Sequence, residues 1–172
     1  QFTQVGDLGL EQLKTLTTLC ELDLSGTLVS DEGLPCLVAL SSLRTLALAN
    51  TSVTGAGFKR FREGAMVRLR LSGSPISDDG LRVIVKIGSL EHLQLAYTDV
   101  TDRGLEHLMA LKALRHLDLA GTDLRNSGLK HLVELKKLRS LSLSYTRLTN
   151  EGIASLGGLV ELERLGLIRT RV

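Results

Sequence analysis

The stretch Leu90–Ala113, LEHLQLAYTDVTDRGLEHLMALKA, contains the pattern that decides the fold. Its first half alternates, with Leu93 and Leu95 separated by one polar residue, which is the period-two signal of a short strand with one buried face. In its second half leucines recur at intervals of three from Leu105 to Leu111, which is typical of one apolar stripe on a helix of about three turns. The stretch therefore predicts one strand followed by one helix.

The same pattern recurs along the whole chain. Aligned on the residue that precedes each strand, the units begin at Leu19, Leu43, Met66, Leu90, Leu114, Leu138 and Leu162. The spacing is 24 residues, except for 23 residues in the unit that contains FKRFREGAM. We therefore predict a single repeat domain over residues 1–172, with partial repeats at 1–18 and 162–172, and we expect it to be a fragment of a longer array.

One strand and one helix cannot enclose a hydrophobic core, so the units must stack. Stacked in register, the strands form a parallel sheet, the helices form a second layer, and the leucines fill the space between the two. The predicted fold class is α/β, a repeat solenoid. The composition agrees, because the chain has 17 Gly, no Trp and five Phe and Tyr residues together, so its core must be mainly aliphatic.

Charge and cysteine content restrict the possible partners and compartments. The net charge is +2, and Lys and Arg are interspersed with Asp and Glu. This distribution argues against nucleic acid or an anionic membrane as the main partner, and no apolar run is long enough to cross a bilayer. Cys20 and Cys36 form neither a disulfide framework nor a metal-binding spacing, which favours a reducing, cytoplasmic compartment.

The repeated text LxxLxLxxTxVTDxGLxxLxxL resembles the leucine-rich repeat family over essentially all 172 residues. It is similar to a 24-residue subclass found in bacterial, especially planctomycete, proteins, and to the longer cysteine-containing repeats of F-box substrate receptors. The chain has Thr or Ser where those receptors have Cys, and it has no F-box-like segment. The resemblance implies a right-handed curved stack with the sheet on the concave side, short helices on the convex side, and binding across the concave face.

Most of the polar residues that recur in every unit are predicted to support the frame. The ninth place holds Thr or Ser, whose hydroxyl groups we expect to form a ladder that satisfies loop backbone, rather than a row of nucleophiles or an ice-binding face. Thr101 or Asp102 is expected to cap the following helix. Gly104 and its equivalents, always at the fifteenth place, indicate close backbone approach or a backbone dihedral that a side chain would forbid, rather than a phosphate loop. The adjacent acids Asp78 and Asp79 lie in this capping segment, so we predict no catalytic role for them.

The third, fifth and eighth places differ between units and face the open side of the sheet. His92 and His116 are predicted to be neighbours about 4.8 Å apart across adjacent strands, with Asp118 beside His116. Two imidazoles could share a metal or sense pH, but a stable zinc site needs three or four ligands, so duplication of the repeat is the preferred explanation. His92 is followed by Gln94 on the same predicted strand.

Arginines and tyrosines complete the predicted surface. Arg68 and Arg70 place two guanidinium groups on one strand, where an acidic partner could bind them. Tyr97 and Tyr145 lie two units apart with Gly121 between them, which predicts two rings flanking a gap of roughly 10 Å. Tyr and Arg are the residue types that most often anchor protein interfaces.

The sequence therefore predicts a non-enzymatic module that binds a protein or peptide. The predicted partner-binding residues are Arg68, Arg70, His92, Gln94, Tyr97, His116, Asp118 and Tyr145. We predict no catalytic residue, cofactor or metal. The alternative is a substrate-recognition arm of a larger enzyme or ubiquitin-ligase component, with the chemistry outside this segment. Self-association is also expected, because uncapped terminal repeats would expose Phe2 at one end and Leu165, Leu167 and Val172 at the other.

Overall fold

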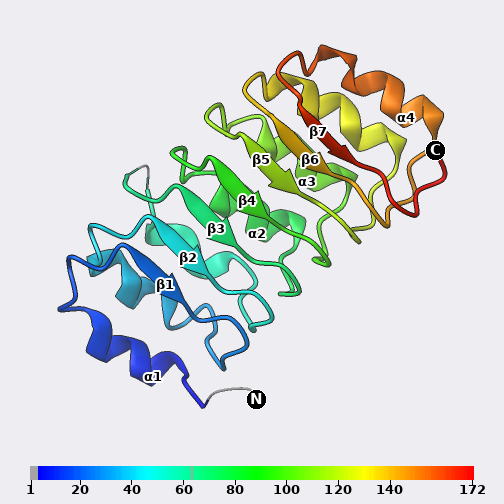
Figure 1. Ribbon diagram of the computed structural model, residues 1–172. Coiled ribbons are helices and arrows are strands. Elements are labelled where there is room, and N and C mark those ends of the chain that lie inside the picture. Colours follow the sequence, from blue (N-terminus) through cyan, green and yellow to red (C-terminus); the bar gives the residue numbers. More distant parts are fainter. Residues whose placement is uncertain (1–3, 63) are drawn as a thin grey trace.

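A single parallel sheet runs through the part of the chain that the computed structural model describes, which is residues 4–62 and 64–172 (Figure 1). Phe2 lies outside these residues. The strands are β1 (Glu21–Asp23), β2 (Thr45–Ala47), β3 (Arg68–Arg70), β4 (His92–Gln94), β5 (His116–Asp118), β6 (Ser140–Ser142) and β7 (Arg164–Gly166). They lie in sequence order, and each pairs with the strand of the next unit. Each strand occupies the third to fifth places of its unit, as the alternating leucines predict.

The register keeps equivalent residues of successive units side by side. Leu69 pairs with Leu93, which in turn pairs with Leu117, and the flanking residues follow the same rule. The shorter second unit does not disturb this register, because Thr45 still pairs with Arg68. Each third- and fifth-place side chain therefore has its counterparts directly beside it on both neighbouring strands.

Most of the helices are shorter than the three turns predicted. The helices are α1 (Asp7–Leu10), η1 (Glu11–Leu13), η2 (Leu34–Ala39), η3 (Ala56–Arg60), α2 (Asp78–Ile84), α3 (Asp102–Leu108), η4 (Asn126–Glu134), α4 (Asn150–Ala154) and η5 (Ser155–Gly158). η4, with nine residues, reaches three 3₁₀ turns. Several are 3₁₀ helices because leucines at intervals of three match the three-residue turn of a 3₁₀ helix at least as well as an α-helical stripe. In η4 this spacing buries Leu129 and Leu132 on one side.

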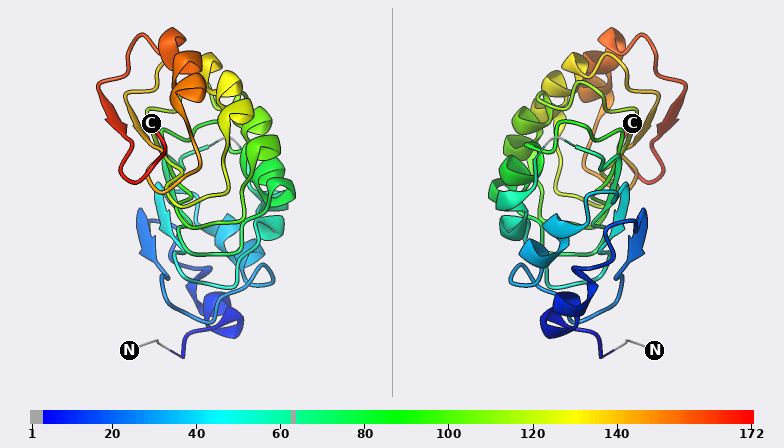
Figure 2. Two further views of the ribbon diagram at one scale, coloured as in Figure 1. Left: turned by 90° about the vertical axis from the view of Figure 1, so that its right-hand side faces the viewer. Right: turned by 90° about the vertical axis from the view of Figure 1, so that its left-hand side faces the viewer.

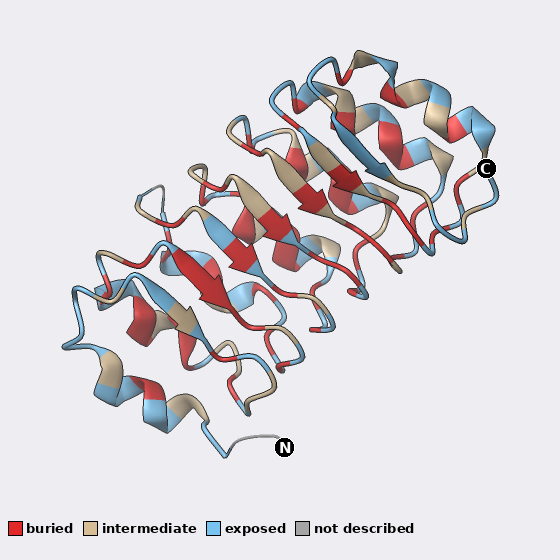
Figure 3. Ribbon diagram, in the orientation of Figure 1, coloured by how far each residue is buried: buried red, intermediate tan, exposed pale blue. Residues whose placement is uncertain are grey.

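The core lies between the sheet and the helices (Figure 3). In the unit that begins at Leu90, β4 supplies Leu93, the residue after it is Leu95, and α3 supplies Leu105 and Leu108; all four leucines are fully buried. The molecule is curved, with the sheet on the inner side and the helices on the outer side (Figure 2). The helices thus cover only one face of the sheet. None of the helices in the described part of the chain combines the length and apolar character needed to span a membrane.

The ninth-place hydroxyl groups bond mainly within their own units. Each threonine at this place donates a hydrogen bond of 2.6–2.9 Å to the carbonyl oxygen three residues earlier, as Thr98 does to Leu95. The predicted contact between neighbouring hydroxyl groups occurs between Thr51 and Ser74, 3.2 Å apart. These residues therefore satisfy loop backbone as expected, but chiefly as separate turns closed within each unit.

The thirteenth-place acids join successive units, which the sequence did not reveal. A side-chain oxygen at this place accepts a hydrogen bond from the twelfth-place N–H of the following unit. The pairs are Asp7 with Ser30, Asp31 with Thr54, Asp78 with Thr101, Asp102 with Arg125 and Asn126 with Thr149, at 2.8–3.0 Å. Thr101 also caps its own helix, α3, by accepting a bond from Arg103 N. Asp102, the alternative predicted cap, instead bonds to the next unit.

The fifteenth-place glycines make room for these links. A Cβ atom on Gly104 would meet the Asp78 carboxylate, and one on Gly128 would lie 2.8 Å from Asp102 Oδ1. At Gly80 a Cβ would instead collide with the backbone of Thr54, because the preceding unit has Gly55 in place of the acid. The predicted close approach is thus confirmed, and its partner is usually the side chain of the preceding unit.

Candidate functional site

All eight predicted binding residues lie on the concave face or at its edge. Arg68 and Arg70 belong to β3, His92 and Gln94 to β4, and His116 and Asp118 to β5. Tyr97 and Tyr145 lie in the turns that follow β4 and β6. The leucines between the strand residues point the other way, into the core. Alternation along each strand therefore separates the frame from the variable surface.

The two concave histidines stack on each other. Their ring centroids are 4.1 Å apart and their planes differ by 9°. This contact follows from the register, which pairs His92 with His116 directly. Burial lowers the pKa of His92 below its usual value of 6.5, and the nearby His116 and Arg68 act in the same direction. The stack therefore favours neutral His92 at physiological pH.

A shallow depression of about 270 Å³ surrounds the histidine stack. It is lined by His92, Leu93, Gln94, His116, Leu117, Asp118, Ser140 and Ser142. Asp118 turns one carboxylate oxygen towards its own strand end, where Oδ1 accepts a 3.0 Å bond from Ala120 N. The depression offers imidazole, amide, carboxylate and hydroxyl groups within two strand spacings, which suits a polar peptide segment.

The tyrosines contact each other, so the predicted gap between them is wrong. Their ring centroids are 6.4 Å apart and the rings are tilted by 45°. A Cβ on Gly121 would collide with the Tyr97 ring, which shows that this ring leans over the glycine towards Tyr145. The guanidinium carbon of Arg169 lies 5.6 Å from the Tyr145 ring centroid. The result is an exposed, continuous aromatic ridge, Tyr97–Tyr145–Arg169, in place of a slot.

The eighth place has a left-handed backbone in each of the seven units from Leu19 onward, a feature that was not predicted from the sequence. The positive φ angles belong to Gly26, Asn50, Gly73, Tyr97, Gly121, Tyr145 and Arg169, and they range from 54° to 73°. Gly and Asn tolerate this conformation, whereas Tyr and Arg adopt it rarely. Glycine at three of these places and asparagine at a fourth were the available signal. The turn thus presents Tyr97 and Tyr145 at the cost of backbone strain.

A second depression, of about 420 Å³, lies over β1, β2 and β3. Its lining is Glu21, Leu22, Asp23, Thr45, Ala47, Arg68 and Arg70. Its two arginines are among the predicted binding residues, whereas its acids and its threonine were not predicted. Hydrogen bonds from Ser25 lower the pKa of Asp23, and the charge of Arg70 acts in the same direction. The concave face therefore has a charged region and an aromatic region in one continuous sheet.

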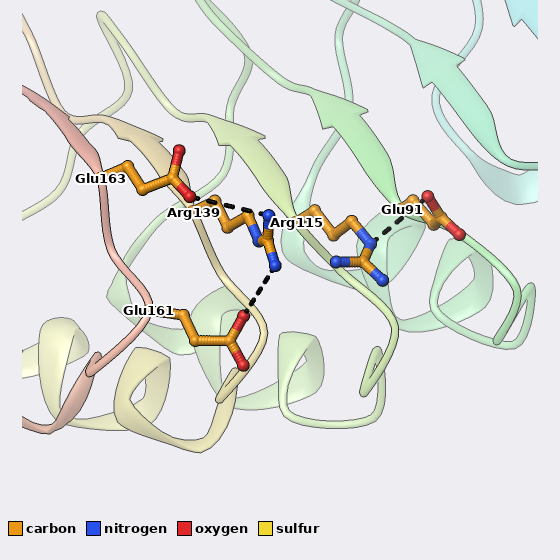
Figure 4. Close-up of polar contacts among 5 residues, drawn as sticks. All are labelled: Glu91, Arg115, Arg139, Glu161 and Glu163. Atoms are coloured by element: carbon orange, nitrogen blue, oxygen red, sulfur yellow. Dashed lines mark hydrogen bonds and ion pairs between the residues drawn. The ribbon is translucent and has the colours of Figure 1, made fainter.

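Ion pairs border the sheet where the chain enters the strands (Figure 4). Arg115 Nε lies 3.5 Å from Glu91 Oε2 in the preceding unit. Arg139 lies 3.4 Å from Glu161 at the end of its own unit and 3.6 Å from Glu163 in the following unit. These side chains are partly or largely exposed, so each pair contributes at most about 1 kcal/mol to stability. They are already paired, whereas no ion pair of the β3 arginines is found among residues 4–62 and 64–172.

No cluster of three or more His, Cys, Asp or Glu side chains suited to a metal ion occurs within residues 4–62 and 64–172. Cys20 and Cys36 are both free thiols, with Cys36 buried. The Cys36 Sγ donates to Glu11 Oε1 at 3.1 Å, and burial raises the pKa of this thiol.

Comparison with known proteins identifies the architecture. A family model described as Leucine Rich repeat matches residues 89–109, 112–133 and 134–157. The crystal structure of internalin C2 from Listeria monocytogenes is similar, with a TM-score of 0.63 and 21% sequence identity over 97% of this chain and 76% of that chain. A comparison with curated protein sequences found no match. The chain has the fold of an α/β leucine-rich-repeat solenoid.

Proposed function

We propose that the chain binds a protein or peptide across its concave face and performs no chemistry itself. The observation that carries this proposal is the open face of the sheet. Parallel sheets in proteins are almost always covered on both faces, whereas here the helices cover only the convex one (Figure 2). A partner laid across the strands would cover the other face.

The side chains on the open face suit protein recognition. Tyr97 and Tyr145 are the tyrosines of the chain, and both are exposed, with 61% and 45% of their surface accessible. Rigid aromatic groups that are already in contact lose little conformational freedom on binding. The histidine stack and the arginines of β3 add polar anchors along the same line. We propose that the partner contacts Arg68, Arg70, His92, Gln94, Tyr97, His116, Asp118 and Tyr145.

Selection from a random peptide library tests this function while the natural partner is unidentified. The immobilised chain should enrich a set of peptides, and the triple variant Tyr97→Gly, Tyr145→Gly, His116→Gln should fail to retain them. A matched variant on the helical side, His107→Gln with His131→Gln, should retain them fully. Equal retention by the concave variant, or loss confined to the helical variant, would refute binding through the concave face.

The same concave surface would bind the substrate if the chain were the recognition arm of a larger enzyme or of an F-box-type ubiquitin-ligase component. The contacts to the partner would be unchanged, because the chemistry would lie in another part of that protein. The likeness of the repeat text to the 24-residue bacterial subclass and to F-box receptors is the basis for this alternative. A catalytic or F-box segment in the full-length gene would decide in its favour.

Self-association through the terminal units is a further proposal. In the last unit Leu165 is 40% exposed, whereas its counterpart Leu117 is 2% exposed. Val160 and Ile168 are also exposed near this end. Burial of such side chains against a second copy would be favourable. Sedimentation should show association that weakens in Leu165→Lys, and a strictly monomeric chain at high concentration would refute it.

A further inference from the structure

Two parallel rows of side chains cross the depression at the N-terminal end of the concave face. The register pairs Glu21 with Thr45 and Thr45 with Arg68. It likewise pairs Asp23 with Ala47 and Ala47 with Arg70. Each row therefore consists of an acid, a small residue and an arginine, and we call this site the charge-separated depression.

The two walls of the depression carry opposite charges that are not paired with each other. β1 and β3 are separated by one intervening strand, so their axes lie about 10 Å apart. Among the described residues, the ion pairs within 4.0 Å include none that joins these acids to these arginines. All four charged side chains are exposed, and the small residues between them leave open a space of about 420 Å³.

Thr45, which lies in the middle of the depression, is a second and independent indication that a ligand binds here. Its side chain shares the concave face with Glu21 and Arg68, yet the residue is only 9% exposed. Its Oγ1 is the one buried side-chain polar atom, within the described part of the chain, that has no hydrogen-bond partner. A buried hydroxyl without a partner is unfavourable for folding, and a ligand that bonds to it would remove that penalty.

We propose that the charge-separated depression binds a partner segment that carries a basic and an acidic side chain two or three residues apart. The carboxylate would bind Arg68 and Arg70, the ammonium or guanidinium group would bind Glu21 and Asp23, and a polar group between them would bond to Thr45. Arginine and carboxylate form bidentate, charge-assisted hydrogen bonds, which makes this pairing specific. The inference rests on the proposed function, because it defines the chemistry of the partner on the same concave face.

The arrangement also fixes a direction. The basic residue of the partner lies over β1 and the acidic residue over β3, next to the histidine stack. The remainder of the segment then runs towards Tyr97 and Tyr145. A partner with two acids and no base would satisfy the arginine wall but leave the acid wall unpaired and repelled.

A titration of the ¹⁵N-labelled chain with capped tetrapeptides tests the proposal. The probes are Lys-Gly-Gly-Glu, Lys-Gly-Gly-Gln and Gln-Gly-Gly-Glu, each acetylated and amidated so that only side chains are charged. The dipolar peptide should shift the amide resonances of Thr45 and Ala47 saturably and bind roughly tenfold more tightly than either singly charged peptide. Equal affinity for Gln-Gly-Gly-Glu would reveal a simple anion site and overturn the proposal, as would the absence of shifts with all three.

Substitutions separate the two walls and the floor. Glu21→Gln should abolish the preference over Gln-Gly-Gly-Glu, and Arg70→Gln should abolish the preference over Lys-Gly-Gly-Gln. Thr45→Val, which keeps the shape, should weaken the dipolar peptide while leaving the fold intact. Asp79→Asn on the convex helix α2 is the matched control and should change nothing. Wild-type affinity in Glu21→Gln would refute the acid wall.

These outcomes are distinguishable from failure of the proposed function. The library selection uses substitutions at Tyr97, Tyr145 and His116, none of which lines the charge-separated depression. Loss of library peptides in that variant, together with no preference for the dipolar tetrapeptide, would refute only the present inference. Retention of library peptides would refute concave binding at the aromatic region itself.

Discussion

Asp78 and Asp118 show how the loop edge of the solenoid differs from its concave face. Asp78 accepts bonds from Thr101 N at 2.8 Å and Thr101 Oγ1 at 2.7 Å, so its hydrogen-bonding capacity is used by the next unit. Asp118 lines an open depression and accepts a bond from Ala120 N of its own strand end. The same residue type serves the frame in one place and is available to a partner in the other. The difference is how many of the carboxylate's hydrogen-bond acceptor positions are already occupied by groups of the protein itself.

Gly80→Ala should produce a large loss of stability, because it disturbs the contact between two repeat units. The added Cβ would collide with Thr54 backbone, which cannot move without shifting the preceding unit. We expect destabilisation of about 1–3 kcal/mol from overpacking, partly offset by the helix preference of alanine. Urea unfolding followed by circular dichroism measures it. Gly157→Ala is the control, since a Cβ there meets nothing within 4 Å, and equal midpoints for the two variants would contradict this account.

Asp78 bonds to the next unit, whereas the adjacent Asp79 is an exposed acid. The stability losses of Asp78→Ala and Asp79→Ala can therefore be compared directly. Removing Asp78 leaves the N–H and hydroxyl of Thr101 without their acceptor, at an expected cost of about 1–3 kcal/mol. Asp79 is 88% exposed and makes a 3.3 Å ion pair with Arg82, so its removal should cost less than about 0.5 kcal/mol. Chemical denaturation of both variants provides the comparison. A greater loss for Asp79→Ala would refute the role assigned to the thirteenth place.

The histidine stack makes the stability of the concave face depend on pH. The pKa of His92 is lower in the folded chain than its ordinary value of 6.5, with burial as the first cause and His116 as the second. Above about pH 6.5 both folded and unfolded His92 are neutral, and this group contributes no pH dependence. As pH falls below that value the unfolded state takes up the proton first, so stability decreases until the folded pKa is passed.

His116→Gln removes the second cause and should raise the pKa of His92 towards its ordinary value. The loss of stability on acidification below pH 6.5 should then be smaller than in the wild type. Titration of the His92 ring resonances by NMR measures the pKa directly, and His131→Gln serves as the control on the helical layer. An unchanged or lower pKa of His92 in His116→Gln would show that the stacked imidazole does not influence its partner.

The sequence predicted the parts of the molecule that depend on periodicity. Leucine alternation placed every strand, and the constant unit length placed His92 beside His116. Contacts that depend on side-chain rotamers could not be predicted from the repeat periodicity. Tyr97 and Tyr145 meet because the left-handed turn lets one ring lean over Gly121, whereas strand spacing alone predicts a gap. Asp102 was correctly placed near a helix start, but alignment of units cannot show that its acceptor atoms face the following unit.

Tyr97→Gly should have only a small effect on stability and yet a large effect on binding. Tyr97 has a φ of 56°, which glycine adopts without steric cost, although glycine also increases the entropy of the unfolded chain. The lost contact with Tyr145 is an exposed aromatic pair, so we expect a net change below about 1 kcal/mol. Library peptides should nevertheless dissociate from this variant, measured by surface plasmon resonance against the wild type. Destabilisation comparable to Gly80→Ala would instead show that Tyr97 supports the fold, and the distinction between the two regions would fail at this residue.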